Sequence, residues 1–152
     1  MKIRIEIAED ESEEIVIRCR ERTQEVKLIE SVVENILKGG SELTLTIGSR
    51  EYYVPKGEIL FFETYDGKVC AHTRDRMYQT GYKLFELEEL LPVYFVRISK
   101  SVIANVRQIS SLGREITGNG EITFKGCDKA TYFSRGYYKI LKDKIEEVRF
   151  GK

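Results

Sequence analysis

The chain has 152 residues, of which 41% are hydrophobic and 33% are charged, and its formal net charge is zero. No apolar run approaches the roughly 18 residues that a membrane span requires, and the opening MKIRIEIAEDESEE lacks the apolar core of a secretory signal. We therefore expect a cytoplasmic protein with enough chain for two small domains.

Charge is distributed unevenly along the chain. Residues 1–50 carry 8 basic and 11 acidic side chains, residues 51–93 carry 5 and 8, and residues 94–152 carry 12 and 6. A net charge of zero argues against binding to nucleic acid, whereas the basic last third favours it, because phosphate contacts require clustered Lys and Arg. Chance unevenness of a charged surface explains these counts equally well, so the motifs must decide.

Signals for an enzyme or a metal site are weak. Cys19, Cys70 and Cys127 are widely spaced and odd in number, which is typical of reduced thiols rather than of a disulfide framework. Because the chain has one histidine, His72, and no CxxC pair, no zinc ligand set with a recognised spacing can be assembled. No nucleophile with a base and an orienting group can be named either. We expect no enzymatic activity, metal, cofactor or small-molecule substrate.

The first 40 residues predict a small ββα unit. Residues 2–7 place isoleucines at alternate positions, and residues 14–20 contain a second β-branched run, so two strands are expected. Apolar residues then recur at helical spacing over 24–38, with Thr23 as the N-cap, which indicates one amphipathic helix.

The next part of the chain predicts β-hairpins. One is expected over 43–54 around Gly48–Ser49, and another over 59–73 around Asp66–Gly67. Gly and Asp tolerate the positive φ that two-residue turns require, so the second signal is strong. Further strands are expected at 76–80, 95–98, 103–112, 114–117, 121–125 and 129–133.

Two more helices are expected in the second half of the chain. Leucines recur at helical spacing over 84–91, and Pro92 ends that pattern. Ser134 can cap a last helix whose apolar stripe begins at Tyr138 and continues through Leu141.

The segment FVRISKSVIANV, residues 95–106, gathers its polar residues into one exposed turn around Lys100 between two apolar runs. Two other cations stand beside turns or helix starts. Lys68 follows the Asp66–Gly67 turn, and Arg135 follows Ser134 at a helix N-terminus, whose free N–H groups can bind phosphate. Each of these three cations, taken alone, is more simply explained as a solvated surface charge. Their order along the chain is more informative.

That order resembles the LytTR family of bacterial DNA-binding domains. The matching segments are FFETYDGKVCAHT, a polar third strand, LFELEELLPVYFVRISKSVIANVRQI and YFSRGYYKILKDKI, over about residues 56–147, and F-V-R-I-x-x-S-x-x-x-N is the specific portion. The resemblance implies an α+β protein: the small N-terminal ββα unit, then an elongated, mostly antiparallel β domain with two helices. It also implies that loops, instead of a recognition helix, enter successive major grooves of duplex DNA.

By position, the resemblance places DNA contacts at Tyr65–Lys68, Ser99–Ser101 and Ser134–Arg135. It favours Arg135 for base readout, because a guanidinium fork can bind guanine O6 and N7 together, and Lys100 for phosphate. Asn105 and Tyr138 match landmarks that we interpret as scaffold. The predicted DNA-binding residues are Lys68, Arg97, Ser99, Lys100, Ser101, Ser134, Arg135 and Lys139.

We expect residues 51–152 to form the DNA-binding domain and residues 1–50 to form an α+β region for dimerisation or regulation. The latter is too short for the receiver domain of many relatives, so control by phosphorylation is not expected. Expected partners are duplex DNA, a second copy of the chain on repeated half-sites, and an inhibitory membrane protein that a crosslinked pull-down should recover. The alternative is a protein-interaction module on the same fold, favoured by the acidic residues 1–93.

Overall fold

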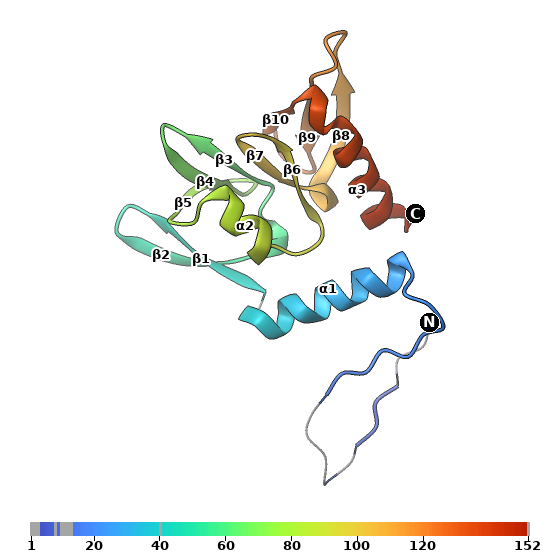
Figure 1. Ribbon diagram of the computed structural model, residues 1–152. Helices are drawn as coiled ribbons and strands as arrows, with labels where there is room; N and C mark the ends of the chain where they lie inside the picture. The colour runs from blue at the N-terminus through green and yellow to red at the C-terminus, as the bar shows by residue number, and fades with distance from the viewer. Residues whose placement is uncertain (1–3, 8, 10–13, 40, 152) are drawn as a thin grey trace.

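The computed structural model describes residues 4–7, 9, 14–39 and 41–151. Within them, a seven-stranded sheet and a three-stranded sheet are accompanied by three α-helices (Figure 1). The α+β class and the mostly antiparallel β domain with two helices are confirmed. The elements are α1 (Gln24–Gly39), β1 (Glu42–Ile47), β2 (Arg50–Pro55), η1 (Lys56–Glu58), β3 (Phe61–Tyr65), β4 (Lys68–His72), β5 (Met77–Thr80), α2 (Leu84–Leu90), β6 (Phe95–Ser99), β7 (Val102–Asn105), η2 (Val106–Gln108), β8 (Ile109–Arg114), β9 (Gly120–Phe124), β10 (Ala130–Phe133), η3 (Arg135–Tyr137) and α3 (Tyr138–Phe150).

The N-terminal region differs from the predicted ββα unit. Helix α1 begins where expected, with Thr23 Oγ1 accepting a hydrogen bond from Val26 N at 3.3 Å. The two strands predicted before it are wrong, because residues 4–7 and 14–19 form no strand. Ile5 and Ile7 are 84% and 93% exposed. A strand needs a hydrogen-bonded neighbour and a surface that covers its apolar face, and the described part of this chain provides neither there.

The seven-stranded sheet has the order β2-β1-β5-β4-β3-β7-β6, and all its pairs are antiparallel. Both predicted hairpins are confirmed. Asp66 and Gly67 have φ of 51° and 72°, so the β3–β4 turn uses the left-handed conformation that Gly and Asp tolerate. Because β1 pairs with β2 and β5, this sheet begins before residue 51. The division at residue 50 stays a prediction.

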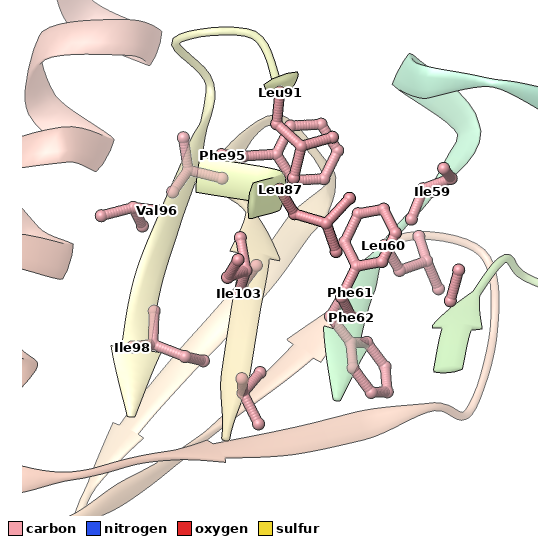
Figure 2. Close-up of a cluster of buried hydrophobic side chains, with 14 of the residues drawn as sticks. Ile59, Leu60, Phe61, Phe62, Leu87, Leu91, Phe95, Val96, Ile98 and Ile103 are labelled. Atoms are coloured by element: carbon pink, nitrogen blue, oxygen red, sulfur yellow. The ribbon is translucent and has the colours of Figure 1, made fainter. Parts of the chain in front are cut away.

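The core lies where α2 covers strands β3, β6 and β7. Figure 2 shows Leu87 and Leu91 gathered with Phe62, Phe95 and Ile103 in one apolar cluster. Leu87 and Phe62 are 0% exposed, and Ile103 is 1% exposed. Full burial of each such side chain stabilises the fold by about 1.5–3 kcal/mol, so this cluster holds β6 and β7 firmly against β3.

Two strand predictions in the second half are wrong. The strand expected over 103–112 is interrupted by η2, where Asn105 Oδ1 accepts a hydrogen bond from Arg107 N at 3.0 Å and turns the chain. β8 then begins the three-stranded sheet, of order β10-β9-β8. The strand expected over 114–117 is instead mostly the β8–β9 turn, in which Gly118 N donates to Glu115 O at 3.0 Å.

The last helix begins later than expected. Ser134 precedes the short 3-10 turn η3, makes no side-chain capping bond, and α3 starts at Tyr138. The cap prediction is therefore wrong, because the Ser134 carbonyl, rather than its hydroxyl, accepts the hydrogen bond from Tyr137 N at 2.9 Å. Leu141 is 0% exposed, so α3 is anchored in the same core as the sheets.

Candidate nucleic-acid interface

Backbone hydrogen bonds bring three of the predicted contact segments together. Thr64 N, at the end of β3, donates to Ser101 O in the β6–β7 turn at 2.9 Å. Ser134 N, just after β10, donates to Ile98 O in β6 at 3.0 Å. The β3–β4 turn, the β6–β7 turn and Ser134–Arg135 therefore lie at one end of the domain, which we call the three-turn end. Lys68, Lys100 and Arg135 are all exposed on it.

The β6–β7 turn is held from behind by Arg97. Its Nε donates to Ser99 O at 2.9 Å, its second terminal nitrogen donates to Lys100 O, and its Nη1 lies 2.7 Å from Glu88 Oε1 in α2. The guanidinium is thus bonded to groups of the protein through three nitrogens. Arg97 therefore shapes the turn that presents Lys100, and the direct DNA contact that the sequence predicted for it stays a prediction.

Arg135 is held by the β8–β9 turn. Its backbone N–H donates to Asn119 Oδ1 at 2.8 Å, and its aliphatic stem lies directly over Gly118. Sequence reasoning assigned no role to this turn beyond joining two strands. The pair Asn119–Gly120 predicts a turn. It gives no indication that Asn119 binds the backbone of a residue 16 positions later in the chain.

A groove of about 500 Å³ opens between the two sheets at the three-turn end. Ser99 and Ser101 line one side, Ser134 and Asn119 line another, and their hydroxyl and amide groups can donate or accept hydrogen bonds. The carboxylates of Glu63 and Glu115 also line it. The groove therefore offers many polar groups, and no Lys or Arg side chain is among its described lining residues.

The remaining predicted residues lie outside the groove. Lys68 opens β4, opposite Tyr65 across the β3–β4 turn. Lys139 lies in the first turn of α3 and is exposed.

Among the described residues, no group of three or more His, Cys, Asp or Glu side chains is placed to hold a metal ion, and no described helix is long and apolar enough to cross a membrane.

Comparison with known proteins identifies the fold around this end. Residues 49–146 match the family model of the LytTr DNA-binding domain. The chain belongs to this family. The LytTr match thus covers the three-turn end, the three-stranded sheet and every strand of the seven-stranded sheet except β1, and it includes every residue that the sequence predicted as a DNA contact.

This LytTr-family chain has relatives that it matches over nearly their whole length. An uncharacterized HTH-type transcriptional regulator from a bovine strain of Staphylococcus aureus is 30% identical over 146 residues, which cover 95% of this chain and 98% of the relative. A second from Staphylococcus aureus is 29% identical over the same shares. The LytTr DNA-binding domain of a methyl-accepting/DNA response regulator from Bacillus cereus superposes with a TM-score of 0.65 and 23% identity, over 70% of this chain and 98% of that one.

The relatives' names mention a helix-turn-helix, but this LytTr domain does not use one in its described residues. α2 and α3 are separated in sequence by strands β6 to β10, so they are not the consecutive helices of that motif. Among the predicted DNA contacts, Lys100 lies on the β6–β7 turn, Lys68 opens β4 and Lys139 lies in α3.

A half-buried histidine links the two sheets beside Glu63. His72 Nε2 lies 2.7 Å from Glu63 Oε1, and its ring stacks on Phe61 with centroids 4.3 Å apart. Lys129, just before β10, brings its Nζ to 3.3 Å from His72 Nδ1 and donates to Arg76 O at 2.7 Å. A Lys ammonium can only donate, so Nδ1 accepts and Nε2–H donates to Glu63.

This arrangement predicts a pH dependence of stability. Burial lowers the pKa of His72 from 6.5, outweighing the Glu63 contact that would raise it, and Lys129 lowers it further. As pH falls, the unfolded chain therefore takes up a proton before the folded chain does, and the free energy of unfolding decreases below about pH 6.5. Urea unfolding at about pH 7.5 and 5.5 should show a smaller loss for His72→Gln than for the wild type. Equal losses would contradict the prediction.

Proposed function

We propose that this protein is a cytoplasmic transcriptional regulator that binds duplex DNA with sequence specificity and inserts the loops of its three-turn end into successive major grooves. Membership of the LytTr DNA-binding domain family supports DNA binding. The observation that carries the finer proposal is the pair of hydrogen bonds, Thr64 N to Ser101 O and Ser134 N to Ile98 O, that brings three cation-bearing segments to one end. Turns held this rigidly can present side chains at a set spacing.

The cations have different roles in this proposal. Arg135 reads a base, because its planar fork matches guanine O6 and N7. Lys100 and Lys68 bind phosphates as point charges, and Lys139 can add a phosphate contact from the start of α3. Ser99, Ser101 and Ser134 supply hydroxyl groups between these cations. Arg97 keeps the β6–β7 turn in place.

Replacement of Lys100 by alanine tests the phosphate contact. We expect Lys100→Ala to weaken binding to all duplex sequences alike and to reduce the slope of log K against log salt by about 1, because one fewer counterion is released. Fluorescence anisotropy with a labelled duplex at several salt concentrations measures this slope. Lys27→Ala, which removes an exposed lysine of α1, is the matched control and should leave the slope unchanged. An unchanged slope for Lys100→Ala would remove this turn from the interface.

A protein-interaction module is the second candidate function. The groove carboxylates of Glu63 and Glu115 favour it, because they would repel a phosphate that entered the groove. Titration with duplex DNA at low and moderate salt separates the two candidates. Binding that weakens steeply as salt rises supports the regulator, and absence of binding at low salt supports the interaction module.

We also propose that the N-terminal region, residues 1–50, joins two copies of the chain into a homodimer on repeated half-sites. Arg4 Nη2 lies 2.7 Å from Glu6 Oε1, so these alternate side chains share one side of an extended segment. Ile5 and Ile7 are 84% and 93% exposed, and Ile15 is 63% exposed. A second copy that presents the same residues would cover them in an isologous contact. An inhibitory membrane protein remains a further proposed partner.

Disruption of this apolar segment tests the homodimer. Ile5→Asp combined with Ile7→Asp should convert a dimer into a monomer, because burying two carboxylates at the contact is strongly unfavourable. Sedimentation velocity at a series of protein concentrations measures the change. Glu6→Gln, on the opposite side of the segment, should leave the dimer intact. A wild-type chain that sediments as a monomer throughout would exclude the homodimer proposal.

A further inference from the structure

The β8–β9 turn lies where it can decide the direction of the Arg135 side chain. We propose that Asn119 and Gly118 are positioning residues that hold Arg135 in the geometry for base readout. The inference rests on the proposed function. It assigns a part in sequence specificity to residues that lie outside the three turns. Neither residue need touch DNA for this role.

Asn119 holds the backbone of Arg135. Its Oδ1 accepts the Arg135 N–H at 2.8 Å. The turn that carries Asn119 is itself closed by two backbone bonds, Glu115 N to Asn119 O at 2.8 Å and Gly118 N to Glu115 O at 3.0 Å. These bonds define the conformation of the turn that carries the acceptor. The acceptor defines where the Arg135 backbone lies relative to the three-stranded sheet.

Gly118 holds the side-chain stem. A Cβ at this position would lie 2.5 Å from Arg135 Cδ and 2.6 Å from Arg135 Cγ, so the stem crosses directly over the glycine backbone. Gly118 also has φ of +91°, which other residues rarely adopt. A side-chain stem that is confined on one side loses fewer rotamers on binding. A bidentate contact with guanine also requires the guanidinium to point in one direction.

The segment Ser134–Arg135 is also hydrogen-bonded to the seven-stranded sheet. Ser134 N donates to Ile98 O in β6 at 3.0 Å, and β6 leads directly into the turn that presents Lys100. Arg135 is therefore held between the β8–β9 turn on one side and β6 on the other. This arrangement keeps a constant spacing between the base-reading arginine and the phosphate-binding lysine, which readout of neighbouring grooves requires.

The test uses the full chain and duplexes selected by the wild type from a random pool. Asn119→Ala should bind a selected duplex about 3- to 10-fold more weakly, the range expected for one lost hydrogen bond. It should relax the base preference at the same position as Arg135→Ala, with an unchanged salt slope. In the Arg135→Ala background it should cause no further loss, because its effect passes through the guanidinium.

Two further variants separate positioning from simple structural damage. Asn119→Asp keeps the oxygen acceptor, so it should retain the base preference while its added negative charge weakens binding to all sequences. Thr117→Ala, an exposed change in the same turn, should behave as the wild type. Melting temperatures of all variants should agree closely, because Asn119 is exposed.

The outcomes distinguish this inference from the proposed function. Failure of the wild type to bind any duplex with salt dependence would overturn both. If Arg135→Ala weakens binding and relaxes one base position while Asn119→Ala does neither, the function stands and the positioning role is wrong. An equal loss from Asn119→Ala with and without Arg135 would also overturn the positioning role.

Discussion

Replacement of Arg135 by alanine is expected to weaken binding to a selected duplex by about 1–3 kcal/mol, which is about 5- to 150-fold, and to relax the preference at one base position. The large effect is expected because one side chain supplies both hydrogen bonds to a guanine. The exposed guanidinium stands on a stem that Gly118 and Asn119 hold, so it enters the complex already oriented. Anisotropy titrations and selection from a random duplex pool measure the two effects.

Two control variants sharpen this prediction. Arg135→Lys keeps the charge and loses the planar fork, so it should retain binding to non-cognate duplex and lose the base preference. Arg50→Ala removes an exposed arginine from β2, at the opposite edge of the seven-stranded sheet from β6, and should leave binding unchanged. If Arg135→Ala bound the selected duplex as tightly as the wild type, Arg135 would not be the base-reading residue.

Replacement of Asn105 by alanine is expected to have the largest effect on stability. Asn105 is 0% exposed, and its Nδ2 donates to Ile59 O at 2.9 Å and to Gly57 O at 3.3 Å. Its Oδ1 accepts the N–H of Arg107 at 3.0 Å. Alanine would leave a buried carbonyl and a backbone N–H without these partners. At about 1–3 kcal/mol for each of the two unsatisfied groups, we expect a loss of about 2–6 kcal/mol in the free energy of unfolding.

Urea denaturation measures this loss as a lower midpoint with an unchanged m-value. Gln108→Ala is the matched control, because Gln108 Nε2 also donates to Gly57 O, at 3.0 Å, but through a solvent-exposed hydrogen bond that water can replace. That variant should lose less than about 1 kcal/mol. A loss of similar size in both variants would mean that the buried position of Asn105 does not set its contribution.

The elements that sequence reasoning predicted correctly depend on contacts close in the chain. The β3–β4 hairpin is specified by Asp66–Gly67, whose positive φ values are a property of those two residues. The start of α1 is specified by the Thr23 hydroxyl three residues before Val26 N. The strands predicted at 2–7 and 14–20 had an equally clear pattern of alternation. They failed over 4–7 and 14–19 because a strand also needs a distant partner.

By itself, the amino-acid sequence determined the family, the order of the turns and the candidate cations on them, because motif spacing and turn chemistry are local properties of the chain. Only the tertiary structure decided how those cations are placed and held. The guanidinium of Arg97 is bonded to Glu88 and to the carbonyls of Ser99 and Lys100. Arg135 rests on Asn119, 16 residues away. Such contacts join segments whose approach is set by the packing of two sheets, and no local pattern encodes them.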